Sequence, residues 1–250
     1  MYLRLVIAYD GTDFSGFQKQ PGKRTVQGEL ECLLNQLLGP GKVVGASRTD
    51  AGVHALGQVV VWTGSVPIPE QRVAMVLNRR LPSDVVVHEV RWVPTTFRPI
   101  RDAQAKYYSY CLWIANARPW PGRGRYVTVA EERLSWAILT EAAGIIRGRH
   151  DFMAFRSEGS SAKTTTRHVF QSRWVMEEKG RIWRYDIGAD GFLYHMVRRL
   201  VGTMILCAKT RDLSLLYEGF NNPQGEKMGF VAPAKGLTLK RIDYDEKCWE

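Results

Sequence analysis

The order of strand-like and helix-like segments constrains the fold of this 250-residue chain more than any other feature. The first half contains runs with strand periodicity at residues 2–9, 43–46, 57–63 and 85–93, and helical patterns at residues 25–39 and 70–78. Thr25 is placed to cap the first helix, whose leucines recur at helical spacing until Gly39. The first half therefore has the order β-α-β-β-α-β.

The second half repeats that order. It contains a strand at residues 105–114, a helix at 131–147, a hairpin pairing 168–177 with 181–189, a helix at 192–207 and a strand at 237–244. Each half has the element order of a ferredoxin-like split βαβ unit. We predict an α+β fold of two ferredoxin-like halves, residues 1–103 and 104–250, forming a central antiparallel sheet with helices on one face and a cleft between the halves. Residues 119–125 and 157–166 are predicted loops.

Bulk properties narrow the class of protein without deciding it. The net charge of +10 attracts polyanions, and charge alone leaves nucleic-acid binding open. No apolar run reaches the ~18 residues of a membrane span, and residues 1–10 have the pattern of a strand instead of a cleavable signal, so we expect a cytoplasmic protein. The four cysteines are scattered without CxxC spacing, which predicts neither a disulfide framework nor a zinc site.

Several kinds of active site are excluded by spacing. The five histidines are too far apart in sequence for a metal-binding helix, and the chain has no Gly-rich phosphate loop or GxSxG motif. The segment 47–55 instead places Asp50 among small residues between two predicted strands. Taken alone, Asp50 is more typical of a turn in which Gly52 supplies a positive φ.

The residues around Asp50 extend into a longer pattern. Residues 48–55, Arg-Thr-Asp-Ala-Gly-Val-His-Ala, resemble the signature of the TruA family of tRNA pseudouridine synthases. Further segments resemble the family in the same order, namely residues 9–18, 106–110, 148–152, 191–203 and 232–237. The resemblance therefore spans nearly the whole chain.

The resemblance implies that Asp50 is the catalytic carboxylate. The reaction breaks the N-glycosidic bond of a uridine, turns the uracil and joins its C5 to the ribose, without cofactor or metal. The carboxylate would attack the ribose or the base as a nucleophile, or abstract a ribose proton, and the sequence does not choose between these routes.

Two further residues are assigned by the resemblance. On a helical wheel Arg198 lies at the edge of the apolar arc of the predicted helix 192–207 and Arg199 lies opposite it, so only Arg198 is predicted to be half-buried. Periodicity alone equally allows Arg198 to extend along the surface, whereas the resemblance makes it the partner that keeps Asp50 ionised. Tyr108 is on an apolar strand, where core packing is the usual role, and the resemblance makes it the tyrosine that stacks on the target uracil.

Arg48 resembles the arginine that enters the RNA stack when the nucleotide is flipped out, and a phosphate contact is the alternative. His54 is interpreted as a packing or hydrogen-bonding residue. Two positions depart from the family pattern: Ser47 replaces a frequent glycine and Ile100 replaces a frequent arginine. A predicted RNA-facing surface comprises Arg79, Arg80, Arg98, Arg101, Lys106, Arg147, Arg149, Arg156, Lys163 and Arg167.

The resemblance implies a homodimer that acts on tRNA at uridines 38 to 40 of the anticodon stem and loop. Two other functions compete with this prediction. One is a non-catalytic RNA-binding module, which need not keep Asp50, Tyr108 and Arg198 together. The other is a pseudouridine synthase that acts on other RNA sites.

Overall fold

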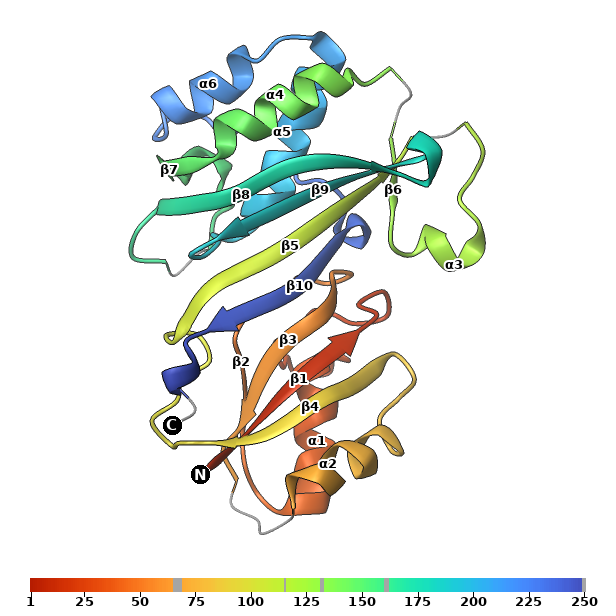
Figure 1. The fold of residues 1–250 in the computed structure, drawn as a ribbon, viewed down its shortest axis with the longest axis vertical. Helices are drawn as coiled ribbons and strands as arrows, with labels where there is room; N and C mark the ends of the chain where they lie inside the picture. The colour runs from red at the N-terminus through yellow and green to blue at the C-terminus, as the bar shows by residue number, and fades with distance from the viewer. Residues whose placement is uncertain (65–68, 115, 131–132, 160–161, 249–250) are drawn as a thin grey trace. The chain divides into compact units, whose positions relative to one another are not determined.

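The structure is a computed structural model that describes residues 1–64, 69–114, 116–130, 133–159 and 162–248. The chain forms two compact units. Unit 1 contains residues 1–104 and 238–250, and unit 2 contains residues 105–237 (Figure 1). The last strand of the chain therefore belongs almost entirely to the unit formed by the N-terminal residues.

Unit 1 is a sheet with two helices. Its elements are β1 (Tyr2–Tyr9), α1 (Val26–Leu38), β2 (Val43–Gly45), β3 (His54–Trp62), α2 (Glu70–Asn78), β4 (Val85–Val93), β10 (Leu237–Tyr244, from Thr238 on) and a final 3-10 turn (Glu246–Cys248). The strand order is β4-β1-β3, and both pairings are antiparallel. Beside β3, β2 pairs antiparallel with its last residues and β10 pairs parallel with His54 and Ala55 at its start.

The core of unit 1 follows from the alternation in the sequence. Leu3, Leu5 and Ile7 alternate along β1 and are fully buried, as are Leu30 and Leu34 of α1. The predicted helix cap is confirmed, because the Thr25 side chain accepts a hydrogen bond from the Gly28 N–H at 3.2 Å. Gly39, with φ +90°, ends the helix as predicted.

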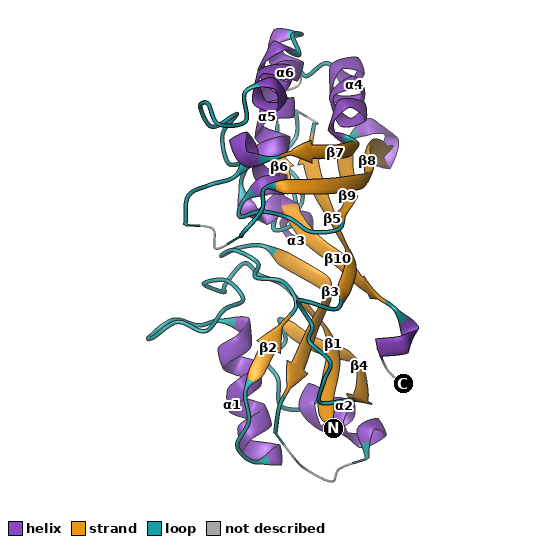
Figure 2. Cartoon of the chain, turned by 90° about the vertical axis from the view of Figure 1, so that its left-hand side faces the viewer, coloured by secondary structure: helices purple, strands orange, loops and turns teal. Residues whose placement is uncertain are grey.

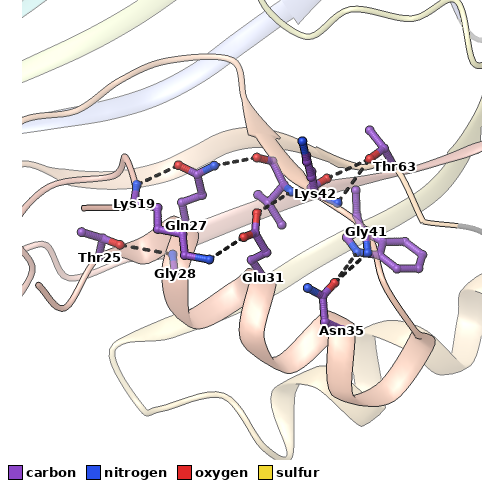
Figure 3. Close-up of polar contacts among 11 residues, drawn as sticks. Lys19, Thr25, Gln27, Gly28, Glu31, Asn35, Gly41, Lys42 and Thr63 are labelled. Carbon is purple, nitrogen blue, oxygen red and sulfur yellow. Dashed lines mark hydrogen bonds and ion pairs between the residues drawn. The ribbon is translucent and has the colours of Figure 1, made fainter. Parts of the chain in front are cut away.

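A polar stripe on α1 joins the helix to the chain on either side (Figure 3). Gln27 accepts from the Lys19 N–H at 2.8 Å and donates to the Val43 carbonyl at 2.7 Å. Glu31, one turn later, accepts from the Lys19 ammonium at 2.7 Å and from the Val43 N–H at 3.0 Å. Asn35, another turn along, accepts from the Gly41 N–H at 3.0 Å. Three residues at i, i+4 and i+8 therefore hold the loop after residue 17 and the start of β2.

Unit 2 has its own sheet and more helices. Its elements are β5 (Ala103–Trp113, from Ala105 on), α3 (Pro121–Gly124), β6 (Thr128–Val129), α4 (Trp136–Ile146), β7 (Gly148–Asp151), β8 (Thr166–Glu177), β9 (Ile182–Ala189), α5 (Met196–Thr210), α6 (Ser214–Asn221) and 3-10 turns at Met153–Phe155, Glu178–Gly180 and Ala234–Gly236. The strand order is β5-β9-β8-β7, all antiparallel, and β6 pairs parallel with β5. Helix α4 packs on β8 and α5, and α6 packs on α5 (Figure 2).

The prediction of a mixed α/β fold with mainly antiparallel strands is confirmed. The segments at 2–9, 70–78, 85–93 and 237–244 have the predicted bounds. The ferredoxin-like description of the halves and the cleft stay predictions. Among the helices of the described residues, none combines the length and apolarity that a bilayer crossing requires.

Three predicted element starts are wrong by three or more residues, and β5 and β8 each begin two residues earlier than predicted. Strand β3 begins at His54, three residues early, and α4 begins at Trp136 after its Ser135 cap, with residues 131–132 of the predicted helix outside the described residues. Helix α5 begins at Met196 instead of residue 192, because His195 has φ +60° and breaks the helical path. Leu193 lies before the helix and is nevertheless buried, so its place in the apolar pattern indicates burial and not helical structure.

Some elements were not predicted. Helix α3 lies inside the predicted loop 119–125, and β6, β7 and α6 had no predicted counterpart. These elements are short, and a strand of two to four residues is too short for its alternation to be read from sequence. The predicted loop 157–166 ends where β8 begins at Thr166, and its residues 160–161 lie outside the described residues.

Candidate active site

The loop between β2 and β3 carries Arg48 and Asp50. Between these two residues Thr49 is buried, and its hydroxyl bonds to the Tyr9 hydroxyl at 2.7 Å. The Thr49 carbonyl accepts from the Phe17 N–H at 3.0 Å. Thr49 therefore fixes the loop to β1 and to the segment 9–18, while Arg48 is exposed and Asp50 is half-buried.

Gln58 of β3 holds the start of the same loop. Its amide accepts from the Ser47 N–H at 3.1 Å and donates to the Ser47 carbonyl at 2.7 Å. The side chain thus satisfies both backbone groups of Ser47 as a neighbouring strand would. A fully buried glutamine inside an apolar strand is costly unless bonded in this way. The sequence analysis did not single out Gln58, although a lone amide in the run 57–63 was the available signal.

Close backbone contacts complete the loop. The Val53 N–H donates to the Asp50 carbonyl at 3.1 Å across a turn whose third residue, Gly52, has φ +78°. Gly16 has φ +94°, and a Cβ there would lie 3.0 Å from the Thr49 carbonyl oxygen. A Cβ on Gly11 would lie 2.0 Å from the Val53 carbonyl oxygen. The positive φ expected at Gly52 is confirmed, and the turn uses the backbone of Asp50.

His54, the first residue of β3, is almost fully buried. Its Nδ1 accepts from the Gly11 N–H at 3.0 Å and lies 3.2 Å from Asp10 Oδ1. The interpretation of His54 as a packing and hydrogen-bonding residue is confirmed. Its ring holds residues 10–11, just after β1, against the loop between β2 and β3.

Unit 2 holds the other two predicted site residues. Tyr108 is buried on β5, and its ring meets Phe192 edge-on at 5.1 Å between centroids. Tyr110 and Leu112 share its face by alternation and are fully buried. Phe192 belongs to the turn that leads into α5, so the tyrosine lies beside the entrance to the helix that carries Arg198.

Arg198 is half-buried on the first turn of α5, as predicted. Its Nε donates to the Ala232 carbonyl at 2.7 Å, and the Ala232 N–H donates back to the Arg198 carbonyl at 3.2 Å. The next residue, Pro233, accepts from the Tyr110 hydroxyl at 2.9 Å. The segment 232–236, part of the family-like segment 232–237, therefore fixes the stem of the arginine and the strand that carries Tyr108.

The prediction that only Arg198, and not Arg199, is half-buried is wrong. Arg199 is also half-buried, and its guanidinium donates to Ser157 Oγ at 3.0 Å and to the Gly229 carbonyl at 3.1 Å. Burial lowers the pKa of Arg199. The cause is a second covering layer, because a Cβ on Gly202 would lie 2.0 Å from the Phe230 carbonyl oxygen. A helical wheel does not show a loop that packs on the polar side of its helix.

The predicted site residues thus fall into two groups. Arg48 and Asp50 share one loop of unit 1, and Tyr108 and Arg198 belong to unit 2, where Phe192 and the segment 232–236 link their elements. Of the predicted RNA-facing cations, Arg101 donates to the Asp102 carboxylate and the Arg98 guanidinium donates to the Thr95 and Phe97 carbonyls. Exposed members of the set include Arg79, Arg80 and Arg149. Within the described parts of the chain, no three histidine, cysteine or acidic side chains are grouped to hold a metal ion.

Comparisons with known proteins identify the family. A family model described as tRNA pseudouridine synthase matches residues 5–99 and 142–245. The chain is 37% identical to tRNA pseudouridine synthase A of Acetivibrio thermocellus over 97% of this chain and 99% of that protein. It is 40% identical to the protein of the same name from Brevibacillus brevis over 97% of this chain and 99% of that protein. Among solved structures, a Cbf5-Nop10-Gar1 complex aligns with 96% of this chain and 50% of its own at 13% identity and a TM-score of 0.39, which adds nothing to the assignment. The chain belongs to the TruA family of tRNA pseudouridine synthases, which are isomerases.

Proposed function

We propose that this chain converts uridines 38 to 40 of the tRNA anticodon stem and loop to pseudouridine, with Asp50 as the catalytic carboxylate. Family membership supports the reaction, and the resemblance described above supports the site on tRNA. The observation that carries the assignment of Asp50 is the construction of its loop. Buried contacts fix Ser47, Thr49 and Val53 on both sides of it, while the Asp50 side chain remains half-exposed.

A loop held in this way suits a reaction whose rate depends on how the carboxylate is placed relative to the nucleotide. Pseudouridine formation breaks the bond between ribose C1′ and uracil N1 and makes a bond from C1′ to C5. The C5 proton leaves and N1 gains a proton, so no atom or electron is lost. One carboxylate serves each route, as a nucleophile on the ribose or the base or as the base that removes a ribose proton. In each case a carboxylate held in place gains from orientation.

The other residues receive supporting roles. Tyr108 stacks on the uracil of the target nucleotide, and Arg198 is the basic residue of the proposed site. Arg48 fills the space that the extruded uridine leaves in the RNA stack. Its exposure on the same fixed loop as Asp50 supports this role, because filling the stack and presenting the carboxylate then depend on one rigid segment.

The proposed reaction uses no cofactor or metal, and the proposed active species is a homodimer. Activity on prefolded tRNA should therefore persist in EDTA. Sedimentation at the concentration used for the assay would give the oligomeric state.

The experiment that tests the proposal is the mapping of pseudouridine in an unmodified tRNA transcript treated with the purified protein. Pseudouridine should form at positions 38 to 40, and Asp50→Asn should lower turnover at least about 10³-fold while tRNA affinity stays within about tenfold, because the amide has the same volume but neither attacks nor takes a proton. Asp212→Asn is the matched control, because Asp212 is exposed and its side chain accepts from the Ser214 N–H, a bond that asparagine also makes.

The outcomes separate the parts of the proposal. Turnover near wild type in Asp50→Asn would remove Asp50 from the catalytic role. If the protein modifies other uridines and Asp50→Asn is inactive, Asp50 keeps its catalytic role and the assignment to positions 38 to 40 is overturned.

A further inference from the structure

Lys106 is a half-buried cation near the proposed uracil-stacking tyrosine. It lies two residues before Tyr108 on β5, so the two side chains share one face of the strand roughly 6–7 Å apart along the chain. Across the ladder Lys106 faces Ala189, which is fully buried. Burial and, second, the positive charge of Arg167 lower the pKa of Lys106 to about 8.

Arg167 is the second cation of the pair. It lies near the start of β8, opposite His150 of β7, and its Nη1 donates to the Thr164 carbonyl at 3.0 Å and to the Thr166 carbonyl at 2.7 Å. These bonds fix the guanidinium through one nitrogen. Gly191 lies beside it, and a Cβ there would be 3.4 Å from Arg167 Nε. The guanidinium is therefore held by backbone oxygens, with a residue that lacks a side chain next to its Nε.

Lys106 pairs with Ala189, and Ala189 pairs with Val169, two residues after Arg167, so by alternation the two cations lie on the same face of the sheet. Their like charges repel, and burial raises the cost for the ammonium. The charged and titratable groups on the strands beside Lys106 and on the turn into α5 are Arg167, His168, His150, Asp190, Tyr194 and His195. The carboxylate of Asp190 accepts from the His168 N–H at 3.0 Å. An anion that contacts both cations would offset their repulsion, and a guanidinium with an ammonium is a pair suited to phosphate.

We propose that Lys106 and Arg167 bind a phosphate of the RNA backbone next to the uridine that stacks on Tyr108. The inference rests on the proposed function of Tyr108 and adds a contact to the same nucleotide. A sugar separates the base of a nucleotide from its phosphate, and the strand separates Lys106 from Tyr108 by a comparable length. Lys163, in contrast, is exposed in the loop before β8 and receives no such role.

Phosphate binding should be coupled to protonation of Lys106. A bound phosphate favours the ammonium form, so the pKa of Lys106 rises in the complex. At pH 8 the free protein carries this group about half-protonated, and the complex carries it protonated. At pH 8 Lys106 should therefore take up about half a proton when tRNA binds, and at pH 6.5 Lys106 should contribute almost none.

The experiment measures tRNA binding by titration calorimetry at pH 8 in two buffers of different ionisation enthalpy, in the Asp50→Asn background so that no turnover occurs. The buffer dependence of the heat gives the protons taken up. Lys106→Arg keeps the charge but does not titrate at this pH, so it should abolish the uptake and leave affinity at pH 6.5 within about threefold. Lys106→Gln should reduce the salt slope of binding by about 0.7 to 0.9, the value for one phosphate.

Arg167→Gln should also lower the salt slope, and it should reduce the uptake at pH 8 because the repulsion that lowers the pKa of Lys106 is gone. Lys179→Arg, the same exchange at the exposed β8–β9 turn, is the control and should keep the full uptake. Thermal melting of each variant confirms that it is folded.

Buffer-independent heats for the parent protein at pH 8, or uptake that persists in Lys106→Arg, would overturn the inference even when tRNA binds normally. A protein that does not bind tRNA at all would instead overturn the proposed function. The two failures are therefore distinguishable.

Discussion

The two regions that carry the candidate site are built in different ways. In unit 1, Arg48 and Asp50 lie in an irregular loop of eight residues, 46–53, whose shape depends on the buried Thr49, the Gln58 amide and two glycines. In unit 2, Tyr108 and Arg198 lie on a long strand and a fifteen-residue helix. Regular hydrogen bonding already fixes the backbone of these two residues.

The difference determines what a perturbation changes. A helix or strand of a packed core keeps its backbone bonds when one contact is lost, so the main cost falls on stability. A loop has no such ladder, and the loss of one tie moves the groups it presents. Changes of similar chemical size should therefore lower turnover more in the loop of unit 1 than in unit 2.

Gly11→Ala and Gly202→Ala test this comparison with the largest expected effects. The Cβ introduced at either position would lie 2.0 Å from a carbonyl oxygen, that of Val53 for Gly11 and that of Phe230 for Gly202. Both should lose about 1–3 kcal/mol of stability, a drop in Tm of roughly 2–4 °C per kcal/mol. Turnover should fall about a hundredfold for Gly11→Ala, which displaces the loop, and only about tenfold for Gly202→Ala.

Turnover is measured at saturating tRNA, below the transition of the less stable variant. Equal losses of turnover in the two variants, at equal stability, would contradict the comparison.

The same contrast explains which parts of the site the sequence could predict. The loop of unit 1 is encoded locally, because Asp50, Gly52 and His54 stand within five residues. The positive φ at Gly52 and the packing or hydrogen-bonding role of His54 could be expected from these residues. Its ties to Tyr9 and Gln58 are long-range and were not predicted.

In unit 2 the positions of the strand and the helix followed from periodicity. The helix start and the burial of Arg199 did not, because a left-handed residue and a covering loop leave no periodic signal. A pattern along one element reports which side meets the core, and it does not report what packs on the other side.

Arg48→Lys sharpens the comparison inside the loop. If Arg48 fills the place of the extruded uridine, the lysine keeps the charge but loses the planar fork, so turnover should fall about 10- to 100-fold with little loss of binding. The peripheral Arg149→Ala should instead weaken binding and lower the salt slope by about 0.7 on a single strand, or nearer one on duplex, with turnover at saturation nearly unchanged. Normal turnover of Arg48→Lys at saturating tRNA would make Arg48 a phosphate contact.

Tyr9→Phe and Tyr110→Phe compare the loss of one buried hydroxyl in each unit. Tyr9 bonds to Thr49 at 2.7 Å, and Tyr110 bonds to Thr128 at 2.8 Å and to the Pro233 carbonyl at 2.9 Å. Each loss should cost about 1–3 kcal/mol, since buried partners are left unsatisfied. Urea unfolding measures this loss of stability. Turnover, measured by single-turnover kinetics, should fall several-fold for Tyr9→Phe and less for Tyr110→Phe. A larger loss of turnover in Tyr110→Phe would reverse the comparison.

The smallest expected effect concerns the pH dependence of stability through Glu31, which holds the chain before and after the helix of unit 1. Burial raises the pKa of Glu31, whereas hydrogen bonds from the Lys19 ammonium and the Val43 N–H lower it. Together the lowering effects are larger, so the pKa of Glu31 in the folded protein is below its ordinary value. A carboxyl whose pKa is lower in the folded state stabilises the protein above its unfolded pKa, and this stabilisation is lost as pH falls through the folded pKa. The parent protein should therefore lose stability relative to Glu31→Gln as pH falls below about 4.5, while the difference between the two stays constant from pH 6 to 8. Lys19 is mostly exposed, so solvent screens its share and the change should be smaller than that of either tyrosine variant. Chemical denaturation across this pH range measures the difference in stability between the two proteins. Turnover at pH 7.5 should fall less in Glu31→Gln than in Tyr9→Phe. Glu31 holds the loop after residue 17 and the start of β2, and it does not touch residues 46–53. A pH-independent difference in stability would remove Glu31 as the origin of the effect.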